Sequence, residues 1–138
     1  MKSYTTCILA LAAFGFACVA SAAEAKGPGA ITRFWVTVAR TDGKGTLTSP
    51  AFTIEKPFIN FLVGGGNYKD QTCVNLVVDG KVVRTVTGKN AERLEWTHWD
   101  VREFKGRTAR IVIVDDRTGH FGHINADCFH FDDAPPRK

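Results

Sequence analysis

Short runs of β-branched and aromatic residues, separated by turn residues, recur along this chain of 138 residues. None shows the sustained period of 3.6 that marks an amphipathic helix, so strands are the natural interpretation. The expected strands are ITRFWVTV (31–38), TLTSPAFTI (46–54), PFINFLV (57–63), TCVNLVV (72–78), KVVRTVTG (81–88), RLEWTHWDV (93–101), RTARIVIVDD (107–116) and HINADCFHF (123–131). About eight short strands with regular turn signals predict an all-β fold, an antiparallel β-sandwich or jelly roll.

The connections between these runs carry local signals. Asp79-Gly80 stands between two β runs and predicts a two-residue hairpin, because both residue types tolerate the positive φ of a type I′ turn. GGGN (64–67) is expected to be a loop, because consecutive glycines weaken a strand or a helix. REFKG (102–106) predicts a turn or a single helical turn.

Some of the runs also indicate a place in the sheet. FINFLV and RIVIV are apolar on both faces, as central strands are, whereas the alternation in TLTSPAFTI suits an outer strand.

The first residues predict export. Lys2 precedes an apolar stretch, Cys7 to Ala20, that is shorter than the roughly 20 residues of a membrane span and runs into an Ala-rich cleavage region. We therefore expect a signal peptide over 1–22 and a secreted or periplasmic product. A lipoprotein site at Cys18 is the disfavoured alternative.

After the signal peptide we expect three parts. An N-terminal segment with the first strand (23–44) precedes one sandwich domain (45–132) and a frayed tail (133–138).

Cysteine and charge counts narrow the function classes. Without the signal peptide only Cys73 and Cys128 remain, and they either form a disulfide or stay as two separate buried thiols. Two cysteines are too few for a zinc site. The net charge of +4 comes from basic residues spread along the chain, with no nucleic-acid motif, so a nucleic-acid partner is not expected.

Carboxylates and histidines allow two further interpretations. A glycosidase needs two carboxylates across a cleft, which Asp115, Asp116 and Asp127 could supply, although strand-end aspartates more often satisfy turn backbone groups. His120 and His123 could hold a transition metal with Asp115 or Asp127. No cofactor is required by the sequence, but a structural calcium held by loop carbonyls and an aspartate is possible.

Aromatic residues in the loops point to carbohydrate. Tyr68 follows the triple glycine, Trp99 lies close to Trp96, and Phe121 stands in a Gly-His loop. A saccharide site needs an aromatic platform for the C–H face of the sugar and polar groups for its hydroxyls. We expect Trp96 and Trp35 to pack in the core of so small a domain.

Five segments between Gly45 and Asp132 resemble the sequence of a known domain family. The segments are GTLTSPAFTIEKPFINFLVGGGN, TCVNLVVDGKVVRTVTGKN, RLEWTHWDV, KGRTARIVIVDD and GHINADCFHFDD. They resemble the accessory β-sandwich domain at the N-terminal side of bacterial levanases and fructan β-fructosidases of glycoside hydrolase family 32. The resemblance implies a galactose-binding-domain-like jelly roll beside polysaccharide degradation. It does not imply catalysis, because the NDPNG, RDP and Glu-Cys motifs of the parent enzymes are absent.

The resemblance also suggests where a ligand would bind. Gly64 to Asn67 match the family's glycine loop, and His123 to Asp127 match its GHIN-x-D segment, with Phe121 where the family usually has Trp. We expect the two loops at one end of the sandwich, in either a structural or a ligand-contacting role. The candidate ligand-binding residues are Asn67, Tyr68, Trp99, Phe121, His123, Asn125 and Asp127.

The sequence therefore predicts a secreted, non-catalytic carbohydrate-binding module with fructan or a related glycan as its partner. The alternatives are a protein-interaction or envelope-structural domain, which would bind a protein partner, and a small glycoside hydrolase.

Overall fold

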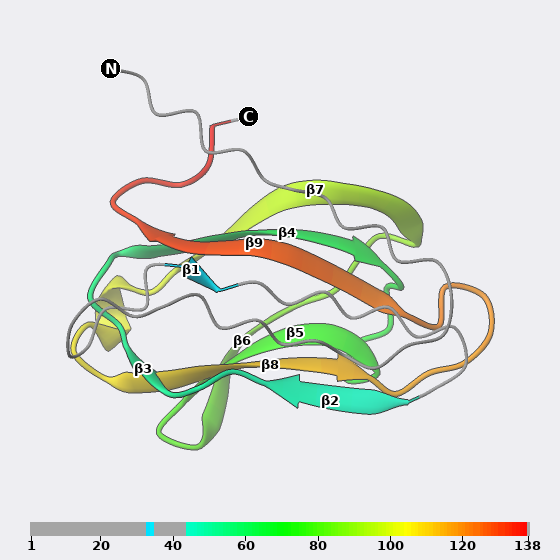
Figure 1. The fold of residues 1–138 in the computed structure, drawn as a ribbon, viewed down its shortest axis with the longest axis horizontal. Helices are drawn as coiled ribbons and strands as arrows, with labels where there is room; N and C mark the ends of the chain where they lie inside the picture. The colour runs from blue at the N-terminus through cyan, green and yellow to red at the C-terminus, as the bar shows by residue number, and fades with distance from the viewer. Residues whose placement is uncertain (1–32, 35–43, 138) are drawn as a thin grey trace.

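Two antiparallel sheets packed face to face make up the described part of the computed structural model, residues 33–34 and 44–137 (Figure 1). One sheet has the order β1-β9-β4-β7, and the other has the order β2-β8-β5-β6, with β3 also paired to β8. The strands are β1 (Arg33–Phe34), β2 (Gly45–Thr48), β3 (Phe52–Thr53), β4 (Phe58–Gly65), β5 (Thr72–Val78), β6 (Lys81–Val86), β7 (Ala91–Asp100), β8 (Thr108–Asp115) and β9 (Ile124–Asp132). The predicted all-β antiparallel sandwich is thus confirmed.

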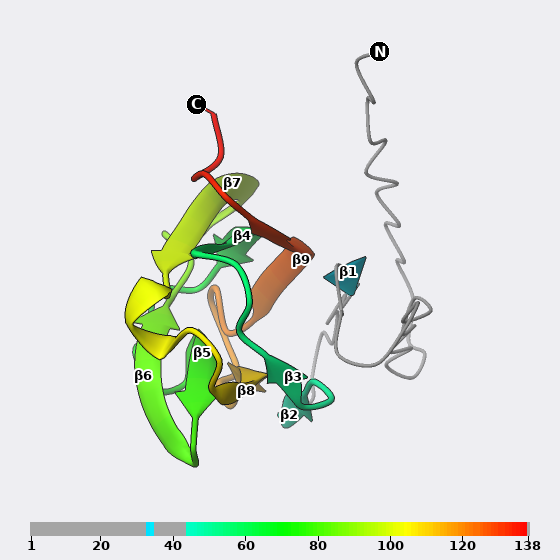
Figure 2. The same ribbon diagram turned by 90° about the vertical axis from the view of Figure 1, so that its left-hand side faces the viewer.

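The core lies between the two layers that Figure 2 shows edge on. Alternate residues of the strands point into it, as Ile59, Phe61 and Val63 of β4 do. Phe61 stacks on Phe129 with ring centroids 4.8 Å apart, which joins β4 to β9 through their side chains. No helix in the described residues is long and apolar enough to cross a membrane.

The central and outer strands are where the pattern predicted them. The doubly apolar runs form β4 and β8, each with neighbours on both sides. The segment 46–54 lies at the edge, but it splits into β2 and β3, which pair with successive parts of β8. Pro50 stands at the break, where it has no N–H to offer a ladder.

The predicted hairpin and helical turn are confirmed. Asp79 and Gly80 have φ of 48° and 78°, the left-handed pair that a type I′ turn requires. A single 3-10 turn, η1 (Arg102–Phe104), follows β7.

The glycine loop differs from expectation, because Gly64 and Gly65 continue β4 instead of leaving it. A Cβ on Gly64 would lie 2.9 Å from the carbonyl oxygen of Arg93 in the neighbouring strand. Gly65 has a φ of +92°, at a point where the register with β7 shifts. Glycine here allows strands to approach closely, and only Gly66 and Asn67 lie outside the strand.

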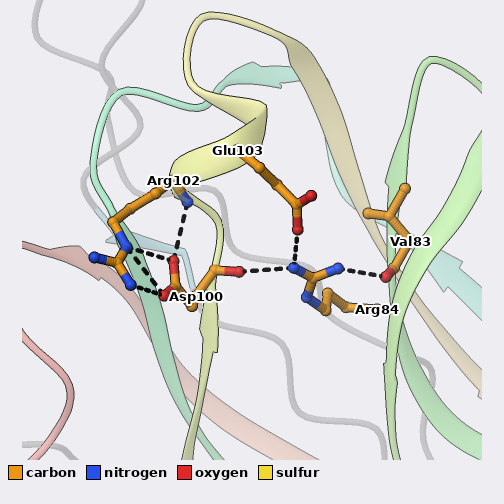
Figure 3. A network of polar contacts seen from close by, with 5 residues as sticks. All are labelled: Val83, Arg84, Asp100, Arg102 and Glu103. Atoms are coloured by element: carbon orange, nitrogen blue, oxygen red, sulfur yellow. Dashed lines mark hydrogen bonds and ion pairs between the residues drawn. The ribbon is translucent and has the colours of Figure 1, made fainter.

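A polar network ties β6 to the end of β7 (Figure 3). Arg84 of β6 donates to the carbonyl oxygen of Asp100 at 3.2 Å and forms an ion pair with Glu103. Its guanidinium also lies over the Phe104 ring, 5.1 Å from the centroid. One side chain therefore links the open edges of the two sheets.

The Cys73–Cys128 disulfide prediction is wrong, because Cys73 is a buried free thiol. In β5, Val74 and Leu76 point into the core, so alternation turns Cys73 to the opposite face. Cys128 belongs to β9 of the other sheet, which packs on the core side of β5, so Cys73 lies on the face of β5 turned away from β9.

The ends of the chain were predicted in more detail than the structure describes. Residues 1–22 and most of 23–44 lie outside the described residues. In the predicted tail, Asp133 forms a 2.6 Å ion pair with Lys56, and the carbonyl oxygen of Ala134 accepts a 2.9 Å hydrogen bond from Asn60 Nδ2. The first two tail residues are therefore held against the domain.

Candidate functional site

Three loops meet at one end of the sandwich, as the sequence predicted for two of them. They are the β4–β5 loop (66–71), the β6–β7 loop (87–90) and the β8–β9 loop (116–123), and we call them the loop end. Gly66 N–H donates to the carbonyl oxygen of His123 at 2.7 Å, and a Cβ on Gly66 would lie 2.1 Å from the carbonyl oxygen of Phe121. The approach of these backbones requires a residue without a side chain.

The polar groups of the loop end mostly satisfy one another. Asn67 Oδ1 accepts a 2.8 Å hydrogen bond from Thr87, and its N–H donates to Asn90 Oδ1 at 2.8 Å. His123 Nε2 lies 3.1 Å from the Glu92 carboxylate, which also accepts from Asn125 Nδ2 at 3.4 Å. Such contacts fit the structural role that the sequence left open for these residues.

The two loop aromatics are half-buried. One face of the Tyr68 ring is covered by Arg117, whose guanidinium carbon lies 3.6 Å from the ring centroid. The Tyr68 hydroxyl donates to the carbonyl oxygen of His120 at 3.3 Å. Phe121 packs against His120 with centroids 4.5 Å apart. Neither ring is an unobstructed platform for a sugar.

The structure therefore brings together five of the predicted residues, Asn67, Tyr68, Phe121, His123 and Asn125. Trp99 does not belong with them: it is 5% exposed and packs in the core, its ring centroid 4.6 Å from that of Phe61. Asp127 lies outside the loop end, on the outward face of β9, where its carboxylate accepts from the N–H of Cys128 at 2.6 Å.

A second group of aromatic and polar residues covers the outward face of the sheet β9-β4-β7, which we call the outer face. Directly opposite residues on neighbouring strands share a face, so the register places these side chains in three rows. The rows are Asp127–Leu62–Trp96, His130–Asn60–His98 and Asp132–Phe58–Asp100.

Trp96 is the main aromatic group of the outer face, and it is 44% exposed. Its ring meets that of His130 edge to face, with centroids 5.6 Å apart and an angle of 85°. The expectation that Trp96 packs in the core is wrong. Trp96 and Trp99 are three positions apart in one strand, so period-2 alternation alone requires that they face opposite sides. That spacing was the signal available in the sequence.

In the row His130–Asn60–His98, hydrogen bonds fix the orientation of His130 and Asn60. His130 Nδ1 lies 3.1 Å from the carbonyl oxygen of Cys128, which can only accept, so Nδ1 carries a proton. In the neutral ring Nε2 is then an acceptor, and Asn60 Nδ2 lies 3.5 Å from it. Asn60 is 1% exposed and His130 is half-buried, so His98 is the exposed side chain of this row.

The carboxylates considered for hydrolysis do not face each other. Asp115 follows Ile111 and Ile113 on the inward side of β8, whereas Asp127 points outward from β9. Among the described residues no group of three or more His, Cys, Asp and Glu side chains could hold a metal ion. The transition-metal interpretation of His120 and His123 therefore has no support in this part of the chain.

Comparison by sequence with known proteins finds a relative that is much longer than this chain. No protein-family model matches the chain. A protein of Aspergillus rugulosus named "Putative glycosyl hydrolase ecdE" is 48% identical over 87 residues, which is 62% of this chain and 12% of that protein. The matched part of this chain thus spans about an eighth of the length of that larger relative.

Among solved structures, a family 35 carbohydrate binding module from an environmental isolate is similar to 82% of this chain and 85% of its own. The TM-score is 0.43 and the sequence identity is 14%.

Proposed function

We propose that this protein is a non-catalytic carbohydrate-binding module and that its outer face holds the sugar. The observation that carries the proposal is the exposed Trp96 within three rows of polar and aromatic side chains. An indole of this kind packs against the apolar C–H face of a pyranose or furanose ring. Neighbouring polar groups then determine which ring is accepted.

The polar neighbours suit sugar hydroxyls. His98 is exposed, and its ring meets that of Phe58 with centroids 5.8 Å apart. Asp127 stands in the same row as Trp96, on the far side of Leu62. Imidazoles donate or accept and carboxylates accept, so a sugar on the indole would have His98 two residues along β7 and the carboxylate of Asp127, which is 9% exposed, two strands away.

The biological setting is also part of the proposal. The larger relative is named as a glycosyl hydrolase, and a small module next to such a domain would keep it on its polysaccharide. Together with the levanase-like segments, this favours fructan as the glycan, and the N-terminal pattern favours export to the periplasm or the medium.

A binding screen tests the proposal directly. The purified chain is applied to a glycan array that includes levan and inulin, with and without calcium, and hits are titrated by calorimetry. We expect Trp96→Ala to weaken binding about tenfold, because the stacking surface is lost. Val82→Ala is the matched control, since Val82 is 58% exposed but belongs to the other sheet.

Two other outcomes would contradict the outer face as the binding site. Binding that survives Trp96→Ala and is lost in Tyr68→Ala or His123→Ala would move the site to the loop end. Absence of binding to any glycan by the folded protein would contradict the proposal and favour the protein-interaction alternative.

A further inference from the structure

The open side of the sandwich, where β6 and β7 lie at the same edge in Figure 2, holds a pocket. It is lined by the end of β6, the β6–β7 loop and the inward side of β7. Trp96 lines it as well, so the pocket adjoins the outer face but opens on a different side of β7.

The bottom of the pocket is apolar. Val63 of β4 is 7% exposed and belongs to the core, and Val86 of β6 packs against that core. Thr87 and Thr97 add hydroxyl groups beside them. An apolar base with hydroxyls at its sides matches the amphipathic surface of a single sugar ring.

The rim of the pocket carries two cations and one anion. Lys89 Nζ and Glu95 Oε2 are 2.5 Å apart. The hydrogen bond from Lys89, helped by the charges of Lys89 and Arg93, holds the pKa of Glu95 below its ordinary value, so Glu95 is ionised at neutral pH. The side chain of Arg93 is exposed, and its guanidinium has no hydrogen bond or ion pair within the described part of the chain.

The rim therefore carries one positive charge in excess of its negative charge. A guanidinium presents paired N–H donors that match the planar oxygens of a carboxylate or the oxygens of a sulfate. We propose that the pocket binds an acidic sugar unit, with its carboxylate or sulfate group on Arg93 and Lys89 and an apolar face of its ring on Val63 and Val86. This site goes beyond the neutral-sugar platform at Trp96 and does not depend on it.

The test titrates three monosaccharides into the intact chain and follows backbone amide signals by NMR. The probes are galacturonate, galactose 6-sulfate and uncharged galactose. We expect saturable shifts at residues 86–97 with at least one acidic probe, and affinity for galactose about tenfold weaker. A preference for galacturonate identifies a uronate as the ligand, and a preference for the sulfate ester identifies a sulfated sugar.

Charge variants make the test specific. Arg93→Gln should weaken binding of the preferred acidic probe about fivefold or more, and Glu95→Gln should strengthen it, because Glu95 competes for the same cations. Lys81→Gln removes an equal charge at the start of β6, away from the pocket, and should leave the affinity unchanged.

Equal affinity for galactose and the acidic probes would overturn the proposal, as would an unchanged affinity in Arg93→Gln. Failure of both acidic probes to saturate the folded chain would also overturn it. The charge variants Arg93→Gln and Glu95→Gln separate this site from the platform, because Trp96 lines the pocket as well and these two variants leave the indole in place.

Discussion

Trp96 and Trp99 lie three positions apart in β7 and face opposite sides of the same sheet. Trp99, opposite Ile59, is 5% exposed and packs on Phe61. Trp96, opposite Leu62, is 44% exposed and meets His130. One strand thus contributes an indole to the core and an indole to the surface.

This relationship predicts unequal effects on folding. Trp99→Ala should lower the free energy of unfolding by about 3–5 kcal/mol, because it removes a large side chain from a packed core. Trp96→Ala should lower it by about 1 kcal/mol or less, because much of that ring is already in water. Urea denaturation followed by circular dichroism measures both. Similar losses in the two variants would contradict the assignment of Trp96 to the outer face.

The sequence predicted the strands and the hairpin because these depend on local patterns. Period-2 runs and the Asp79-Gly80 pair need no partner strand to be interpreted. It did not predict which tryptophan is buried, since that depends on the register of β7 against β4. The direction of the Cys73 side chain could not be predicted either, because TCVNLVV (72–78) is mostly apolar on both faces and does not show which face meets the core.

The loop end was predicted through resemblance and not through local pattern. Nothing in the glycine run itself places it against residues more than 50 positions later, yet Gly66 and Phe121 are in backbone contact. The outer-face site was missed because its rows combine three strands that are far apart in the sequence.

Close backbone approach at Gly66 predicts a sensitive position. Gly66→Ala should lower the free energy of unfolding by about 3 kcal/mol, because the new Cβ collides with backbone that has little room to move. Gly119→Ala is the control: it has a φ of +90° but open space around the Cβ, so strain alone should cost about 1 kcal/mol. Thermal denaturation compares the two variants. An equal loss would show that the loops separate at little cost.

The thiol of Cys73 should be unreactive in the folded protein. Cys73 is buried, and burial raises the pKa of its thiol, so both access and the thiolate fraction are reduced. Ellman's reagent should modify it only after denaturant is added, with the Cys73→Ser variant as the blank. Rapid modification without denaturant would contradict the burial of Cys73.

Acid should weaken the ion pair between Asp100 and Arg102 at the end of β7. The Asp100 carboxylate accepts from Arg102 Nε at 3.0 Å and from Arg102 Nη2 at 2.5 Å (Figure 3). The hydrogen bond from the Arg102 side chain is the main cause that lowers the pKa of Asp100 from 3.8 to about 2, and the Arg102 backbone N–H adds to it.

Because the folded-state pKa is the lower one, ionised Asp100 favours the folded protein above pH 3.8, and this contribution disappears as the pH falls toward about 2. The effect should be small, since the pair is exposed and screened by water. NMR titration of the Asp100 carboxyl should give a pKa that returns toward its ordinary value in Arg102→Gln. An unchanged pKa in that variant would show that Arg102 does not hold the carboxylate. In that case the end of β7 would lack this side-chain contact with the 3-10 turn η1 that follows it.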